Sequence, residues 1–336
     1  MKNKNIKFGS DRKDIIIYIL LSFIVGFLIN FLLHDFTDKH KRESFKNQNF
    51  FESRYSEDYD FVSPLLECDS FESSELAYFD EEIKQVSDNL MQNGTIEDIS
   101  YYFRDLNNGV WIGINEYEKF APASLMKLPL MISYFKQSEE DPSIFSQAFI
   151  FGEEDDNYGK QNIVPEQVMS IGAPYTVPDL IYRMIVFSDN SALRMLLKNS
   201  GAFGLRVFED LGVDIPESDN DEDFIDVRTY SRFFRVLYNA SYLNIQDSNK
   251  ALEILSETQF KDGLVAGVPS NIVVAHKFGE REKDGIRQLH DCGIVYHPNK
   301  PYVICIMTRG KDFDRLESAI SEISKKTFES VDSVFK

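Results

Sequence analysis

The stretch Ile272-Val273-Val274-Ala275-His276-Lys277 has the β-branched character of a buried strand. Two more strand-like stretches follow it, at residues 288–296 and 302–308, and a helical pattern then covers residues 312–335. Strands followed by a terminal helix are typical of a sheet with a helical layer on it. This part of the chain therefore predicts three strands of one sheet and a helix that flanks them.

A hairpin signal far upstream supplies the rest of the predicted sheet. Residues 99–103 and 111–114 look like strands joined by the turn Asn107-Asn108-Gly109. An amphipathic helix precedes them over residues 74–91. Helical patterns lie between the hairpin and the later strands, at residues 177–186, 191–199, 203–211, 228–243 and 250–258. The predicted fold class is α+β, an antiparallel sheet flanked by helices with an all-helical lobe.

The composition allows a large core and excludes some partners. The 336 residues are 43% hydrophobic, enough for one large domain or two small ones. The formal net charge of -19 argues against a nucleic-acid partner, because phosphate backbones are bound mainly by clustered Lys and Arg. The sequence leaves the oligomeric state open.

The cysteines and histidines give no sign of a metal site. Cys68, Cys292 and Cys305 form an odd, sparse set without the spacing of zinc ligands, and the five histidines show no metalloenzyme pattern. Cys292 and Cys305 lie in two strand-like stretches. We expect them to be buried free thiols rather than a disulfide.

An apolar segment near the N-terminus predicts a membrane anchor. Residues 15–33 carry no charge and are long enough to cross a hydrocarbon core of about 30 Å. Basic residues dominate the segment before it, which by the positive-inside rule places residues 1–14 in the cytoplasm. A cleaved signal peptide is the alternative, but His34-Asp35-Phe36-Thr37 offers no small-residue cleavage site.

This orientation predicts three parts after the cytoplasmic N-terminus, of which the last two are extracytoplasmic. Residues 15–33 are the transmembrane anchor, residues 34–72 a polar tether, and residues 73–336 the folded domain. The membrane is thus an expected partner through one N-terminal helix.

Ser124-Leu125-Met126-Lys127 is a candidate nucleophile and base at the start of an apolar helix. Residues three apart share a helix face, so we expect Lys127 to lie under the Ser124 hydroxyl. A desolvated amine has a lowered pKa and can accept a proton near neutrality. Taken alone, the pattern also fits a helix start capped by Ser124 with an exposed Lys127.

Two further motifs could complete such a site. Ser188-Asp189-Asn190 separates two helical stretches and offers a second hydroxyl for proton transfer and an amide for a substrate carbonyl. His276-Lys277-Phe278-Gly279 is expected to end a strand, where Lys277 could attract a carboxylate and Gly279 would let a substrate lie close. Each alone also fits an ordinary polar turn or strand end.

In this order, the three motifs resemble the S-x-x-K, S-D-N and K-T-G motifs of class A β-lactamases and penicillin-binding proteins, over residues 73–336. The resemblance implies Ser124 as nucleophile, Lys127 as base and Ser188 as proton shuttle. It also implies substrate binding by Asn190, Lys277 and Gly279, and an oxyanion hole formed by the backbone N–H groups of Ser124 and Glu280. No metal or cofactor is implied.

The chain departs from the family pattern in two places. Phe278 replaces the hydroxyl residue of the third motif, which removes one hydrogen bond to a substrate carboxylate. The E-x-x-L-N pattern, whose Glu activates the deacylating water in class A enzymes, does not occur between Asn190 and Lys277. The carboxylates available there, among residues 214–226, are expected to form a solvated loop.

Three functions remain open from the sequence. The first is a β-lactamase-like hydrolase with slow deacylation, and the second is a D-alanyl-D-alanine peptidase that acts on peptidoglycan stem peptides. Both would form an acyl-enzyme at Ser124. The third is a catalytically idle domain that binds wall fragments or a protein at the envelope.

Overall fold

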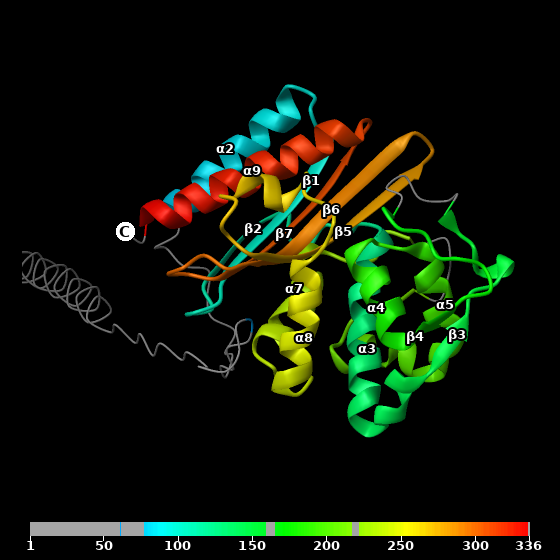
Figure 1. Ribbon diagram of the computed structural model, residues 1–336. Helices are drawn as coiled ribbons and strands as arrows, with labels where there is room; N and C mark the ends of the chain where they lie inside the picture. The colour runs from blue at the N-terminus through cyan, green and yellow to red at the C-terminus, as the bar shows by residue number, and fades with distance from the viewer. Residues whose placement is uncertain (1–60, 62–76, 159–164, 217–221, 335–336) are drawn as a thin grey trace, which may run out of the picture. The chain divides into compact units, whose positions relative to one another are not determined.

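The computed structural model describes residue 61 and residues 77–158, 165–216 and 222–334. Five antiparallel strands form its main sheet in the order β2-β1-β7-β6-β5 (Figure 1). The strands are β1 (Asp98–Asp105), β2 (Trp111–Ile114), β5 (Val274–Lys283), β6 (Ile286–Val295) and β7 (Tyr302–Gly310). The strand β5 is therefore an edge strand, and the two ends of the domain meet where β1 pairs with β7.

Helices cover both faces of this sheet. Figure 1 shows α2 (Ala77–Gln92) and α9 (Phe313–Val334) together on one face, where Ile83, Ile320 and Ile323 join an apolar core with the strands. The other face packs against α7 (Val227–Tyr238) and a larger core. The remaining helices of this second layer are α3 (Lys127–Glu140), α4 (Val177–Val186), α5 (Asn190–Ser200), α6 (Arg206–Asp210) and α8 (Ile245–Ser256). The predicted α+β fold is confirmed.

Shorter elements connect these layers. A two-stranded sheet pairs β3 (Ala148–Ile150) with β4 (Pro174–Thr176), which the sequence did not predict. Single 3-10 turns also occur, η2 (Ala123–Met126), η3 (Pro142–Ser146), η4 (Glu153–Asp155), η6 (Gly201–Leu205) and η7 (Leu264–Gly267). The predicted helix over residues 203–211 is divided between η6 and α6, and the one over 228–243 ends at Tyr238.

The strand β5 is longer than predicted. The motif from His276 to Gly279 lies in its middle, because the strand continues to Lys283 before it turns into β6. The turn is Asp284-Gly285, with φ values of 54° and 78°. Such left-handed pairs are favoured in two-residue hairpin turns, so the turn signal was present in the sequence. The last residues of β5 are charged and exposed, so their sequence does not show the apolar pattern by which a strand is predicted.

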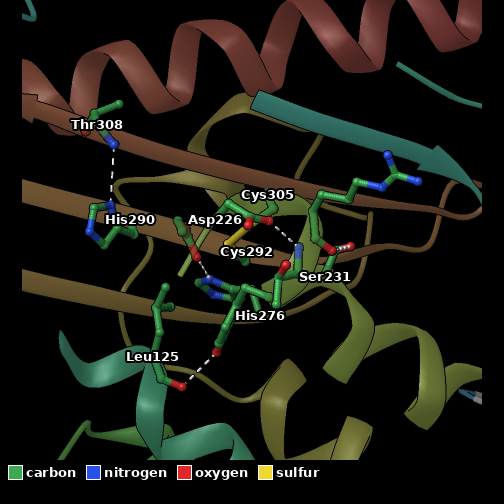
Figure 2. The surroundings of a disulfide bond; sticks show 12 residues. Leu125, Asp226, Ser231, His276, His290, Cys292, Cys305 and Thr308 are labelled. Atoms are coloured by element: carbon green, nitrogen blue, oxygen red, sulfur yellow. Dashed lines mark hydrogen bonds and ion pairs between the residues drawn. A yellow bond between two sulfur atoms is a disulfide. The ribbon is translucent and has the colours of Figure 1, made fainter. Parts of the chain in front are cut away.

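Cys292 and Cys305 form a disulfide, so the prediction of free thiols was wrong. The register of β6 and β7 places them directly opposite each other, with Cα atoms 4.0 Å apart (Figure 2). Both side chains are fully buried on the face that packs against α7. Pairing across two strands depends on their register, which neither cysteine's local sequence reveals.

The predicted anchor at residues 15–33 lies outside the described residues. Within the described ranges, no helix has both the length and the apolar character needed to cross a membrane.

Candidate active site

Ser124 lies in the 3-10 turn η2, one turn ahead of α3. The backbone of Ala123 has a φ of 48°, a strained conformation for a residue with a side chain and one that clusters at functional sites. The Ser124 side chain is half-buried, and its hydroxyl has no hydrogen-bond partner among the described residues. Ser124 therefore does not cap the helix, and its oxygen is available for chemistry.

Three elements hold this turn in place. Tyr230 of α7 donates a hydrogen bond to the Leu125 carbonyl at 2.8 Å. His290 of β6 contacts the Ala121 carbonyl through Nε2 at 3.0 Å. A Cβ atom added to Gly279 would lie only 2.8 Å from the Pro122 carbonyl oxygen, so β5 and the turn can approach this closely only with glycine there.

The Lys127 amine points toward the loop between α4 and α5. Its Nζ donates to the Ser188 carbonyl at 2.5 Å, to the Ser188 hydroxyl at 3.0 Å and to Asn190 Oδ1 at 2.7 Å. The side chain is buried, with 1% of the residue exposed. The structure thus joins the first two sequence motifs through one amine.

Lys277 of β5 contacts the same hydroxyl. Its Nζ donates to Ser188 Oγ at 3.0 Å and to the Phe278 carbonyl at 3.0 Å, and the residue is fully buried. Ser188 itself is held in the left-handed region with a φ of 52°. When Lys127 is protonated, the Ser188 oxygen accepts from two lysines, and its own hydrogen then points away from both.

Burial lowers the pKa of both lysines. Desolvation lowers the pKa of Lys127 to about 7, although the charges of Asp189 and Glu280 oppose the shift. Desolvation and the nearby Lys127 lower the pKa of Lys277 well below its usual range. At neutral pH a large fraction of Lys127 is an uncharged amine, the form that accepts a proton.

Asp189 is buried and fixes the loop that carries Ser188. One carboxylate oxygen accepts from the backbone N–H groups of Ser191 and Ala192 at the start of α5. The other accepts from Arg183 at 3.2 Å and from the Tyr158 hydroxyl at 3.0 Å. Through these hydrogen bonds Asp189 holds the loop that carries Ser188 against the start of α5.

The structure therefore brings together Lys127, Ser188, Asn190 and Lys277 beside the Ser124 turn. The expected hydrogen bond between the Lys127 amine and the Ser124 hydroxyl is not formed within the described residues. Phe278 stacks on Phe260 with ring centroids 4.4 Å apart and is 2% exposed, so its ring belongs to the core.

Three acidic residues that the structure describes before α7 pair with residues other than these two lysines. Asp226 accepts from the Thr229 backbone at the start of α7 and pairs with Lys119 at 2.5 Å. Asp223 pairs with Arg309 at 3.1 Å, and Glu222 with Lys283 at 2.6 Å. None of these three described carboxylates contacts Ser124, Lys127 or Ser188.

Residues that support the site without belonging to its motifs were missed in the sequence. Tyr230 and His290 each contact the turn that carries Ser124 from more than 100 positions away. The sequence around each of them has an ordinary helix or strand pattern, so it gives no sign that the residue contacts the Ser124 turn. Only the packing of α7 and β6 against η2 identifies them.

His290 is expected to make the fold sensitive to acid. Burial lowers its pKa to about 4, from 6.5, and Nδ1 accepts from the Thr308 backbone (Figure 2). The unfolded chain binds this proton first as pH falls, so up to about 3 kcal/mol of unfolding free energy is lost between pH 6.5 and 4. Urea denaturation of wild type and His290→Gln across this range measures the effect. An equally steep pH dependence in the variant would contradict it.

Comparison with solved structures supports the same fold. A mutant of PBP-A, solved as an acyl-enzyme complex with penicillin G, is 22% identical with a TM-score of 0.63, over 75% of this chain and 97% of that one. A class A β-lactamase from Bacteroides cellulosilyticus is 18% identical with a TM-score of 0.65, over 76% and 98%. The extended-spectrum β-lactamase TLA-3 is 17% identical with a TM-score of 0.66, over 75% and 98%.

Sequence comparison places the chain in a family. No curated protein matches this sequence. The model of the β-lactamase enzyme family, however, matches residues 79–331, which include all three motifs and every strand of the main sheet. The chain therefore belongs to the β-lactamase enzyme family.

Proposed function

We propose that this chain is a membrane-anchored, extracytoplasmic serine hydrolase that opens β-lactam rings through an acyl-enzyme at Ser124. The observation that carries the proposal is the Ser188 hydroxyl shared by two buried lysines, one of which follows Ser124 by one turn. Burying two lysine amines costs free energy, and a turn with only a structural role does not require it. The penicillin G complex of the PBP-A mutant supports the substrate class.

Acylation begins with removal of the Ser124 proton. The uncharged Lys127 amine accepts it as the Ser124 oxygen attacks the lactam carbonyl, after a shift of the amine from its resting contacts with Ser188 and Asn190. The backbone N–H groups of Ser124 and Glu280 stabilise the oxyanion, where a single donor contributes about 3 kcal/mol.

The ring opens when the carbon–nitrogen bond breaks. The leaving nitrogen takes the Ser188 hydroxyl proton, which points away from both lysines, and Ser188 regains a proton from Lys127. The net change is the loss of one proton from Ser124 and the gain of one proton by the leaving nitrogen, with Lys127 and Ser188 restored. Lys277, which is also bonded to Ser188, keeps the hydroxyl oriented during this transfer.

A D-alanyl-D-alanine peptidase is the second candidate function. The observation that favours it is the placement of Asp226, Asp223 and Glu222, whose described contacts all lie away from Ser124. A peptidase of this kind uses the same acylation step with a peptide amide as the substrate. Slow hydrolysis of a penicillin adduct is compatible with that role.

The anchor and the extracytoplasmic location are supported by the apolar residues 15–33 and the basic residues before them. The substrates of the proposed reaction, β-lactams and stem peptides, are found on the same side of the membrane.

Covalent labelling tests the proposed function and location together. Cells that produce the full-length chain are expected to show a fluorescent penicillin on this protein, in the membrane fraction. Ser124→Ala, which removes the nucleophile and changes little else, is expected to abolish the label. Equal labelling of the variant would exclude Ser124 as the acylated residue, and an unlabelled wild type would support the idle-domain alternative.

A further inference from the structure

A cavity of about 500 Å³ opens beside Asn190, along the outer side of α5. Asn190 links this cavity to the proposed reactive site, because it lines the cavity and its Oδ1 accepts a hydrogen bond from Lys127. Its lining does not include Ser188 or Lys277, which would serve the leaving nitrogen. We call it the α5 groove; its lining is Glu154, Asp155, Asn157, Asn190, Leu193, Arg194, Leu197 and Lys198.

The helix α5 supplies one wall of the α5 groove in a regular pattern. Asn190, Arg194 and Lys198 are four residues apart, so they lie on one face of the helix. Leu193 and Leu197 add apolar surface beside them, and Leu197 is 49% exposed. A ligand that extends from Asn190 would therefore pass an apolar strip and then a row of cationic groups.

The two cations of this row differ in their partners. Lys198 lies 3.7 Å from Glu154 and 3.6 Å from Asp155, on the opposite wall. Arg194 is exposed and forms no ion pair or hydrogen bond with any residue in the described part of the chain. Since Lys198 neutralises much of the acidic wall, the Arg194 guanidinium is the charged group that a ligand can engage.

We infer that the α5 groove binds the acyl side of the substrate and that Arg194 recognises a carboxylate on it. The inference rests on the proposed acylation of Ser124. Asn190 lines the groove and is the amide proposed to hold the acyl group, so the rest of that group continues along the groove toward Arg194. A guanidinium offers two parallel N–H donors that match the geometry of a carboxylate.

Three penicillins that share one ring system test this inference. Benzylpenicillin carries an uncharged side chain, carboxybenzylpenicillin carries a carboxylate on the same benzylic carbon, and aminobenzylpenicillin carries an amine there. The second-order rate of Ser124 acylation would be measured for each with the full-length protein at one pH. For each variant, the rates for two substrates are divided by each other, so that an effect of the substitution on acylation in general cancels.

Arg194→Gln is expected to lower the ratio of carboxybenzylpenicillin to benzylpenicillin acylation by about three- to tenfold, and Arg194→Lys by less. The benzylpenicillin rate should change little. Arg206→Gln is the matched control, since Arg206 is also an exposed helical arginine, 51% exposed in its side chain and paired with Glu140.

Two results would overturn the inference. One is an unchanged ratio in Arg194→Gln while benzylpenicillin still acylates Ser124, which leaves the proposed function intact. The other is a preference for aminobenzylpenicillin that does not depend on Arg194. It would indicate that Glu154 and Asp155, and not Arg194, bind the charged group of the side chain. If no penicillin labels Ser124, the proposed function fails and the inference with it.

Discussion

Replacing Lys127 with methionine is expected to slow penicillin acylation of Ser124 by about 10²–10⁴-fold, the usual contribution of a positioned general base. Methionine keeps an unbranched side chain in the buried space but cannot accept a proton. Stopped-flow or quenched labelling with benzylpenicillin gives the rate. The Ser188 and Asn190 groups that contact the amine remain in the variant.

The pH dependence identifies the base. Because burial lowers the pKa of Lys127 to about 7, the wild-type acylation rate is expected to rise with pH around a midpoint near 7. Lys127→Met should show no such midpoint. A wild-type midpoint that persists in the variant would assign the base to another group.

The same titration acts on stability with a definite sign. The folded pKa of Lys127 lies below the usual 10.5, so the unfolded chain binds the additional proton between about pH 7 and 10.5. The unfolding free energy contributed by this group therefore rises as pH increases through that window. Lys127→Met should lack this rise, which urea denaturation can measure separately from activity.

Much of the fold could be predicted from the sequence because its strands and helices carry clear periodic patterns. The predicted strand at residues 272–277 overlaps β5 from Val274 onward, and the predicted turn Asn107-Asn108-Gly109 lies between β1 and β2. The end of β5 was missed because Arg281 and Lys283 lie at the exposed tip of a hairpin, where no burial pattern marks a strand.

The candidate site was predictable only as far as its motifs reach. Lys127, Ser188 and Lys277 were identified because their spacing is typical of one family, and the structure brings their side chains together. The supports of the site, Tyr230 and His290, come from elements whose packing no local pattern reveals. The Cys292–Cys305 disulfide was missed for the same reason, since it depends on the register of two strands.

Once formed, the penicillin adduct on Ser124 is expected to persist, because none of the carboxylates that the structure describes just before α7 is placed to supply the roughly 10²–10⁴-fold contribution of a positioned base. Glu222, Asp223 and Asp226 are held by Lys283, Arg309 and Lys119, respectively. Intact-mass spectrometry after removal of free benzylpenicillin follows the loss of the adduct. Nitrocefin should give a burst of product followed by a slow steady rate.

A fast loss of the adduct would contradict this expectation and point to a base that these contacts do not reveal. Glu217, Asp219 and Asp221 lie in the same acidic segment but outside the described residues. Glu217→Gln, Asp219→Asn and Asp221→Asn would then be compared with the matched control Asp223→Asn, whose carboxylate is paired with Arg309. A variant in which the adduct becomes persistent identifies the base and favours β-lactam hydrolysis. A persistent wild-type adduct is compatible with slow β-lactam hydrolysis and with the peptidase, because acylation by the Ser124–Lys127 pair then proceeds without a group that activates the hydrolytic water.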